Sequence, residues 1–125
     1  MNDDLEDEMD ESTSLYYEGR ELLKLKRYAE ARDVLMRSRN LQAHSKTSLL
    51  IGQCYAALGD KDGAYDMYSE SYRLGPQTDQ AALAFAEALL ERGEVSEAEQ
   101  IAKQILKRQP TYGGAIRLLS KLKSG

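Results

Sequence analysis

Apolar residues recur along this chain with the spacing of a helix rather than that of a strand. Four sets follow at steps of three, four or seven residues: Leu15, Leu22 and Leu25; Ile51, Tyr55 and Leu58; Ala82, Phe85 and Leu89; and Ile116, Leu119 and Leu122. Such steps place side chains on one face of a helix. Between the sets lie apolar pairs at i, i+4: Ala31 and Leu35, Ala64 and Tyr68, and Ala98 and Ala102. The pattern predicts seven helices, at about 12–25, 28–41, 45–58, 61–74, 78–91, 95–108 and 112–123.

The same features return at a fixed distance along the chain. Three series each step by 33 and then 34 residues: small residues at Gly19, Gly52 and Ala86, turn residues at Lys26, Gly59 and Gly93, and alanines at Ala31, Ala64 and Ala98. A period of about 20 to 50 residues indicates stacked units of the same supersecondary structure. We interpret the small residues as the points where the two helices of a hairpin approach closely. The sequence therefore predicts three helical hairpins followed by a closing helix.

Local signals for helix ends agree with this division. Gly75-Pro76 is typical of a helix stop, and Pro110 lies 34 residues after Pro76. Ser96 and Glu99 have the spacing of a capping box, which predicts a helix start near Val95.

Together these positions resemble the tetratricopeptide repeat, whose pattern includes a Leu-Gly pair, a Tyr, an Ala-x-x-x-Phe step and a terminal Pro. The second unit matches best, with Ile51-Gly52, Tyr55, Gly59, Ala64, Tyr68 and Pro76 in order. The usual tryptophan is replaced by Leu15, Ser48 and Ala82. The resemblance covers residues 12 to 123 and implies an all-α solenoid wound as a right-handed superhelix. We expect a domain over residues 12–125, with repeats at about 12–44, 45–78 and 79–111 and a capping helix at about 112–123.

In this family the first helices of the repeats line a concave groove that takes a peptide of another protein. The resemblance therefore implies a peptide-binding groove built from residues beside the packing stripe: Tyr16, Arg20, Leu23, Leu49, Gln53, Ala56, Leu83, Glu87 and Leu90, with Arg117 and Lys121 on the closing helix. In each repeat an apolar pair flanks a polar residue, which suits an amphipathic segment. The alternative for any one of these leucines is packing against a neighbouring helix.

One ligand class of the family is argued against. Members that grip the C-terminal carboxylates of heat-shock chaperones use a set of Lys, Asn and Arg side chains. The matching positions here are Tyr16, Arg20, Leu50, Gln80 and Ala84. Only one positive charge remains, so a two-carboxylate clamp is not expected.

Charge is unevenly distributed over the chain. Residues 1–11 carry a net charge of −7, residues 12–99 of −3 and residues 100–125 of +6, which sum to −4. We interpret residues 1–11 as an acidic disordered tail. The charge dipole predicts weak, salt-sensitive self-association. Nucleic acid is a poor partner for two reasons. The net charge of the chain is negative, and the basic end of the chain offers no aromatic residue for base stacking beyond Tyr112.

No set of residues with catalytic or cofactor-binding spacing is found. Cys54 is the lone cysteine and His44 the lone histidine, too few for a zinc site or an internal disulfide. The stretch Asp60-Lys61-Asp62-Gly63 fits a turn between helices better than a calcium loop. No apolar run approaches the roughly 20 residues that span a bilayer, and the acidic start is unlike a secretory signal. We therefore expect a cytoplasmic protein with no membrane insertion, no metal, no cofactor and no enzymatic activity.

The resulting hypothesis is a protein-interaction adaptor or a co-chaperone that holds a segment of a partner protein. Two alternatives stay open from the sequence: the N-terminal interaction module of a longer enzyme, for example a transferase, and a self-assembling scaffold protein.

Overall fold

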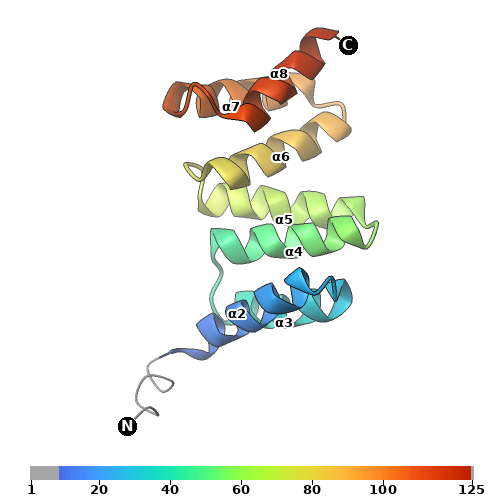
Figure 1. The fold of residues 1–125 in the computed structure, drawn as a ribbon, viewed down its shortest axis with the longest axis vertical. Helices are drawn as coiled ribbons and strands as arrows, with labels where there is room; N and C mark the ends of the chain where they lie inside the picture. The colour runs from blue at the N-terminus through green and yellow to red at the C-terminus, as the bar shows by residue number, and fades with distance from the viewer. Residues whose placement is uncertain (1–8, 125) are drawn as a thin grey trace.

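Seven helices stacked as hairpins make up residues 9–124, the part of the chain that the computed structural model describes (Figure 1). No strand occurs within these residues. The helices are α2 (Glu11–Lys24), α3 (Tyr28–Leu41), α4 (Ser45–Ala57), α5 (Lys61–Leu74), α6 (Asp79–Glu91), α7 (Val95–Arg108) and α8 (Gly113–Ser124). Each helix end lies within one residue of its predicted position, so the predicted all-α fold is confirmed.

The small residues have the steric role that the sequence predicted. A side chain at Gly19 would clash with Leu35, and a Cβ at Gly52 would lie 2.5 Å from the ring of Tyr68. The facing alanines Ala31 and Ala98 have no exposed surface. The two helices of each hairpin therefore pack closely, because no side chain stands between them at these points.

The three predicted turn residues share one backbone conformation. Lys26, Gly59 and Gly93 have φ angles of 62°, 84° and 82°, in the left-handed region that glycine adopts without strain. Leu25 and Leu58, which we expected in the packing stripe, are instead exposed. Each is the C-cap of its helix, where the chain turns away from the packed face.

The helix starts differ from the sequence expectation in two places. The predicted capping box is wrong: α7 has Glu94 as its N-cap, and no side chain caps it. Side-chain caps occur instead at Asp10, which accepts from the Thr13 amide at 2.7 Å, and at Asp60, which accepts from Gly63 at 2.8 Å. Residues 10 and 11 thus belong to the start of α2 rather than to an acidic tail. Residues 1–8 of that predicted tail lie outside the described residues.

Two apolar clusters of unequal size fill the stack. The N-terminal cluster has a buried centre of only Ala31, Leu35, Ile51 and Cys54. The C-terminal cluster buries ten residues from α6, α7 and α8, among them Phe85, Leu89 and Ile105. From α8, Ala115 and Leu118 join this cluster, so the last helix covers the apolar face of the third hairpin.

The first repeat joins the second through a polar network. From α3, Arg39 donates through Nε to Oε2 of Glu70 on α5 at 2.6 Å, and a second guanidinium bond reaches Oε1. From α4, Ser48 donates to Oε2 of the same carboxylate at 2.6 Å. The hydrogen bond from Arg39 is the main cause that lowers the pKa of Glu70, against an opposing effect of burial.

The second repeat joins the third through aromatic rings. On α5, Tyr72 stacks on Phe85 of α6 with ring centroids 5.3 Å apart, and Tyr65 lies 5.7 Å from the same ring. The two junctions between repeats thus use different chemistry.

Candidate functional site: a groove between the second and third repeats

A hollow of about 1090 Å³ opens between α4, α5 and α6. The two outer helices, α4 and α6, are the first helices of the second and third repeats. Along the stack, α5 lies between α4 and α6 (Figure 1), and α4 also approaches α6 directly. We call this hollow the groove. Tyr112, just before α8, also lines it.

The floor of the groove is apolar and half exposed. The floor is formed by seven half-buried apolar or aromatic side chains: Leu50, Tyr65, Tyr68, Leu83, Ala84, Ala88 and Tyr112. On α6, Ala84 precedes Ala88 by four residues, about one helical turn, so these two lie on one face. Apolar surface is therefore left in contact with water along the floor.

The rim of the groove is polar and exposed, and its charge is mostly negative. Four carboxylates line it, from Asp62, Glu87, Glu91 and Glu94, against two cations, from Lys61 and Arg92. Within the described residues, the ion pairs include none made by Glu87, Glu91 or Glu94.

Arg92 is held in the wall by two contacts. Its guanidinium donates to Oδ1 of Asp62 at 2.9 Å, and its Cζ lies 3.7 Å from the centroid of the Tyr65 ring. A cation over an aromatic face at this distance is attracted by the ring's negative π surface. Arg92 thereby ties the turn after α6 to the start of α5.

Tyr68 brings the floor and the acidic rim together. Burial is the main cause that raises the pKa of its hydroxyl, followed by the negative charges of Glu87 and Glu91. The hydroxyl therefore keeps its proton at neutral pH and can donate a hydrogen bond into the groove.

A comparison with protein families decides the family of the chain. The family model described as tetratricopeptide repeat matches residues 55–122, more than half of the sequence. The chain belongs to the tetratricopeptide repeat family. The family is one of protein-interaction scaffolds. A search of curated proteins found no significant match.

Solved tetratricopeptide structures share the fold. The first such domain of Spaghetti (RPAP3), bound to the HSP90 peptide SRMEEVD, is 17% identical with a TM-score of 0.82, covering 91% of each chain. The type III secretion translocator chaperone SycD of Yersinia enterocolitica is 25% identical with a TM-score of 0.75, covering 94% of this chain and 86% of that one. SycD in complex with a peptide of the translocator YopD is 24% identical with a TM-score of 0.70, covering 89% and 86%.

Of the eleven residues predicted for the tetratricopeptide groove, five line the hollow: Leu49, Gln53, Ala56, Leu83 and Glu87. Leu49 is only 7% exposed, so it contributes mainly to packing. Tyr16 lies at a separate hollow of about 470 Å³ near the start of α2. The other five lie outside both hollows: Arg20, Leu23, Leu90, Arg117 and Lys121.

Three of those outlying residues have other contacts. Leu23 packs against the N-terminal cluster and Leu90 against the C-terminal cluster. The Arg20 guanidinium lies over the ring of Tyr17, 4.8 Å from its centroid.

The sequence prediction missed the part of the groove that comes from second helices and turns. Tyr65 and Tyr68 reach it from α5, and Arg92 and Glu94 from the turn after α6. Glu91 was recognisable, because it follows Glu87 by one helical turn. The pairing of Arg92 with Asp62 had no signal in the spacing of residues.

Other reactive side chains lie away from the groove. Burial raises the pKa of the Cys54 thiol to about 11, so the thiol is protonated and unreactive at neutral pH. His44 is exposed at the N-cap of α4. Among residues 9–124, no three metal-binding side chains converge. Each helix in the same part of the chain is too short or too polar to cross a bilayer.

Proposed function

We propose that this protein is an interaction module that holds a peptide segment of a partner protein in the groove between α4 and α6. The observation that carries the proposal is the half-exposed apolar floor surrounded by an exposed polar rim. This is the usual arrangement of a protein-binding surface, in which the centre provides affinity and the rim provides specificity.

The related structures support this use of the groove. RPAP3 carries an HSP90 peptide, and SycD carries a peptide of YopD. Both share the fold with this chain. The hollow here is open along the stack, and an elongated segment fits such a shape better than a compact small molecule does.

The test blocks the groove without changing its charge. Ala56 and Ala84 line the groove with small side chains, and the double variant Ala56→Gln/Ala84→Gln fills it with longer neutral ones. Gln is a good helix former, so helicity should be retained. The matched control is Ala29→Gln/Ala57→Gln, because both alanines are exposed on helices but lie outside the groove.

Affinity capture from cells that express the protein, read by mass spectrometry, measures the result. We expect a partner that is retained by the wild type and by the control and lost with the groove variant. If the groove variant retains every captured protein in equal amount, binding occurs elsewhere and the proposal is wrong.

A further inference from the structure

The charges on the rim of the groove identify a class of partner segment. Arg92 is already engaged by Asp62, which leaves the carboxylates of Glu87, Glu91 and Glu94 against the single ammonium of Lys61. All four side chains are exposed. The unpaired charge on the rim is therefore negative, and a positively charged segment is attracted to it.

The groove already holds one cation of the kind we infer. Arg92 places its guanidinium between a carboxylate, Asp62, and an aromatic face, Tyr65. Tyr68 lies near the carboxylates of Glu87 and Glu91, which repeats this combination of ring and acid. Among the described residues, no side chain forms an ion pair with Glu87 or Glu91.

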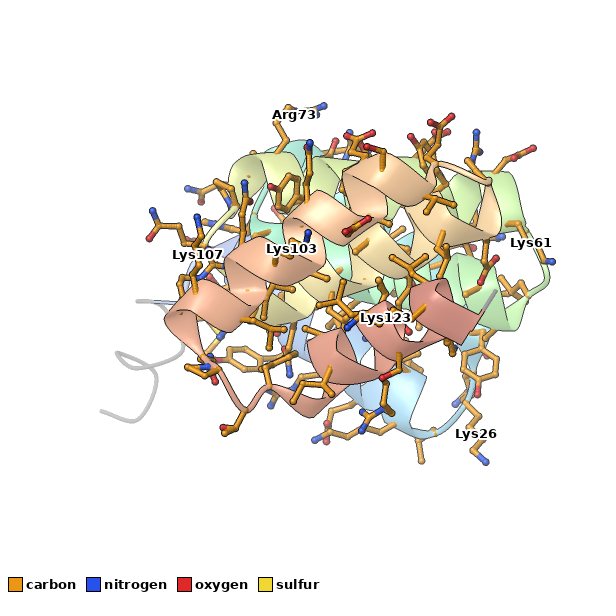
Figure 2. All side chains as sticks on the ribbon, turned by 90° about the horizontal axis from the view of Figure 1, so that it is seen from above. Lys26, Lys61, Arg73, Lys103, Lys107 and Lys123 are labelled. Carbon is orange, nitrogen blue, oxygen red and sulfur yellow. The ribbon has the colours of Figure 1, made fainter. Side chains whose placement is uncertain are left out.

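Basic side chains elsewhere in the molecule lie outside the groove. Figure 2 shows Lys107 at the side of the stack opposite Lys61. Lys103, also on α7, is paired with Glu99 at 2.8 Å. Neither lysine lines the groove. These two lysines therefore do not neutralise the acidic rim.

We propose that the groove selects a basic amphipathic segment, with Lys or Arg side chains facing Glu87 and Glu91 and apolar side chains seated on Leu83 and Ala84. This inference rests on the proposed function and adds the chemistry of the ligand. Glu87 and Glu91 are one turn apart, about 6 Å along the helix axis. Cations at i and i+4 of a helical segment match this distance, as do cations at i and i+2 of an extended one, which are about 6.6 Å apart.

The inference also excludes a class of ligand. An acidic segment, such as the SRMEEVD peptide bound by RPAP3, would bring carboxylates against Glu87 and Glu91. Like charges placed opposite one another oppose binding. Two cations line the groove, but Arg92 is paired with Asp62, and Lys61 alone does not offset the remaining carboxylates. The absence of the carboxylate clamp, expected from the sequence, leads to the same exclusion.

The test is a selection from a displayed library of random peptides on the full chain. The probe protein is compared with Glu87→Lys/Glu91→Lys, which reverses the rim. The matched control, Asp66→Lys/Glu97→Lys, changes the net charge by the same amount through exposed helical acids that do not line the groove. Circular dichroism checks that all variants keep their helices.

We expect the wild type and the control to enrich peptides with an excess of Lys and Arg over Asp and Glu, and the reversed variant to lose that excess. Enriched peptides that are neutral or acidic, but are lost with Ala56→Gln/Ala84→Gln, would overturn the inference and leave the proposed function standing. Basic peptides that bind the reversed and blocked variants as well as the wild type would show attraction to overall charge, which also overturns it. No enrichment with any variant would contradict both proposals.

A binding titration with one enriched peptide measures how much the two carboxylates contribute to affinity. Glu87→Gln/Glu91→Gln removes two exposed charges, and we expect about two- to tenfold weaker binding. The difference from wild type should shrink at high salt, because exposed charges are screened. An unchanged affinity at low salt would contradict the inference.

Discussion

The two junctions between repeats occupy the same place in the solenoid and are built from different side chains. Arg39, Ser48 and Glu70 form the hydrogen-bonded network of the first junction. The residues one repeat later, 33 or 34 positions along the chain, are Tyr72, Ala82 and Gln104. In the second junction Tyr72 stacks on Phe85, and Phe85 takes the repeat position of Ile51.

The comparison shows that a repeat fixes geometry but not chemistry. Stability in a solenoid is the sum of repeats and their nearest-neighbour interfaces, so each junction contributes separately. The second junction depends on apolar area and ring contacts. The first depends on a carboxylate that is nearly buried, with its side chain 11% exposed, and that keeps its charge through Arg39. The two junctions should therefore respond differently to substitution and to pH.

The largest expected effect is at the second junction. Phe85→Ala removes a ring that is 7% exposed and contacts both Tyr65 and Tyr72. The lost burial and the cavity left behind should lower the free energy of unfolding by about 3–5 kcal/mol. Urea denaturation measures it, with the exposed Val95→Ala as a control expected within about 0.5 kcal/mol of wild type. A loss below about 1 kcal/mol would show that the rings do not hold the junction.

The next largest effect is expected at the first junction, where the loss of stability should depend on pH. Glu70→Gln removes the charge that Arg39 and Ser48 bond, and should lower the free energy of unfolding at neutral pH by about 1–3 kcal/mol. The folded-state pKa of Glu70 lies below its ordinary value of 4.5, so its contribution is full above pH 4.5 and is lost as the pH falls through the lower folded-state value. The gap between wild type and variant should close over that range in urea titrations. A gap that stays constant with pH would mean that the charge is not what stabilises the junction.

The smallest effect is expected for a variant in which the polar residues of the first junction are replaced by those of the second. The triple variant Arg39→Tyr/Ser48→Ala/Glu70→Gln puts the second junction's residues into the first. Replacing a whole buried ion pair by uncharged, packed groups is often close to neutral, so we expect a change within about 1 kcal/mol of wild type. Arg39→Tyr alone should cost more than the triple, because it leaves the Glu70 carboxylate with only the longer 3.9 Å contact to the exposed Arg73. If the triple is less stable than both Arg39→Tyr and Glu70→Gln, the two junctions are not interchangeable.

Most of the fold could be predicted because its determinants repeat. Small residues at Gly19 and Gly52 mark close helix contacts, and the positive φ at Lys26 could be expected from the glycines at the same place in later repeats. The capping box failed because Ser96 lies inside the first turn of α7, one position after the helix starts. A cap depends on where the chain enters the helix, and a spacing of three residues does not determine that point.

Less of the groove could be predicted. Gln53 and Glu87 were expected on the groove face of α4 and α6 from the family resemblance, and both line the hollow. Tyr65 and Arg92 belong to other elements, and they reach the groove only because the third hairpin stacks on the second. Stacking geometry depends on side-chain packing between repeats, which no short spacing in the sequence encodes.

Tyr65 belongs both to the second junction and to the floor of the groove. In a solenoid, the contacts between neighbouring repeats set how one repeat is placed on the next. Because one ring serves both as such a contact and as part of the floor, the packing of the third repeat on the second also shapes the groove. A segment seated beside Tyr65 would therefore touch the same ring that packs the third repeat on the second, so binding and the stability of this junction are linked.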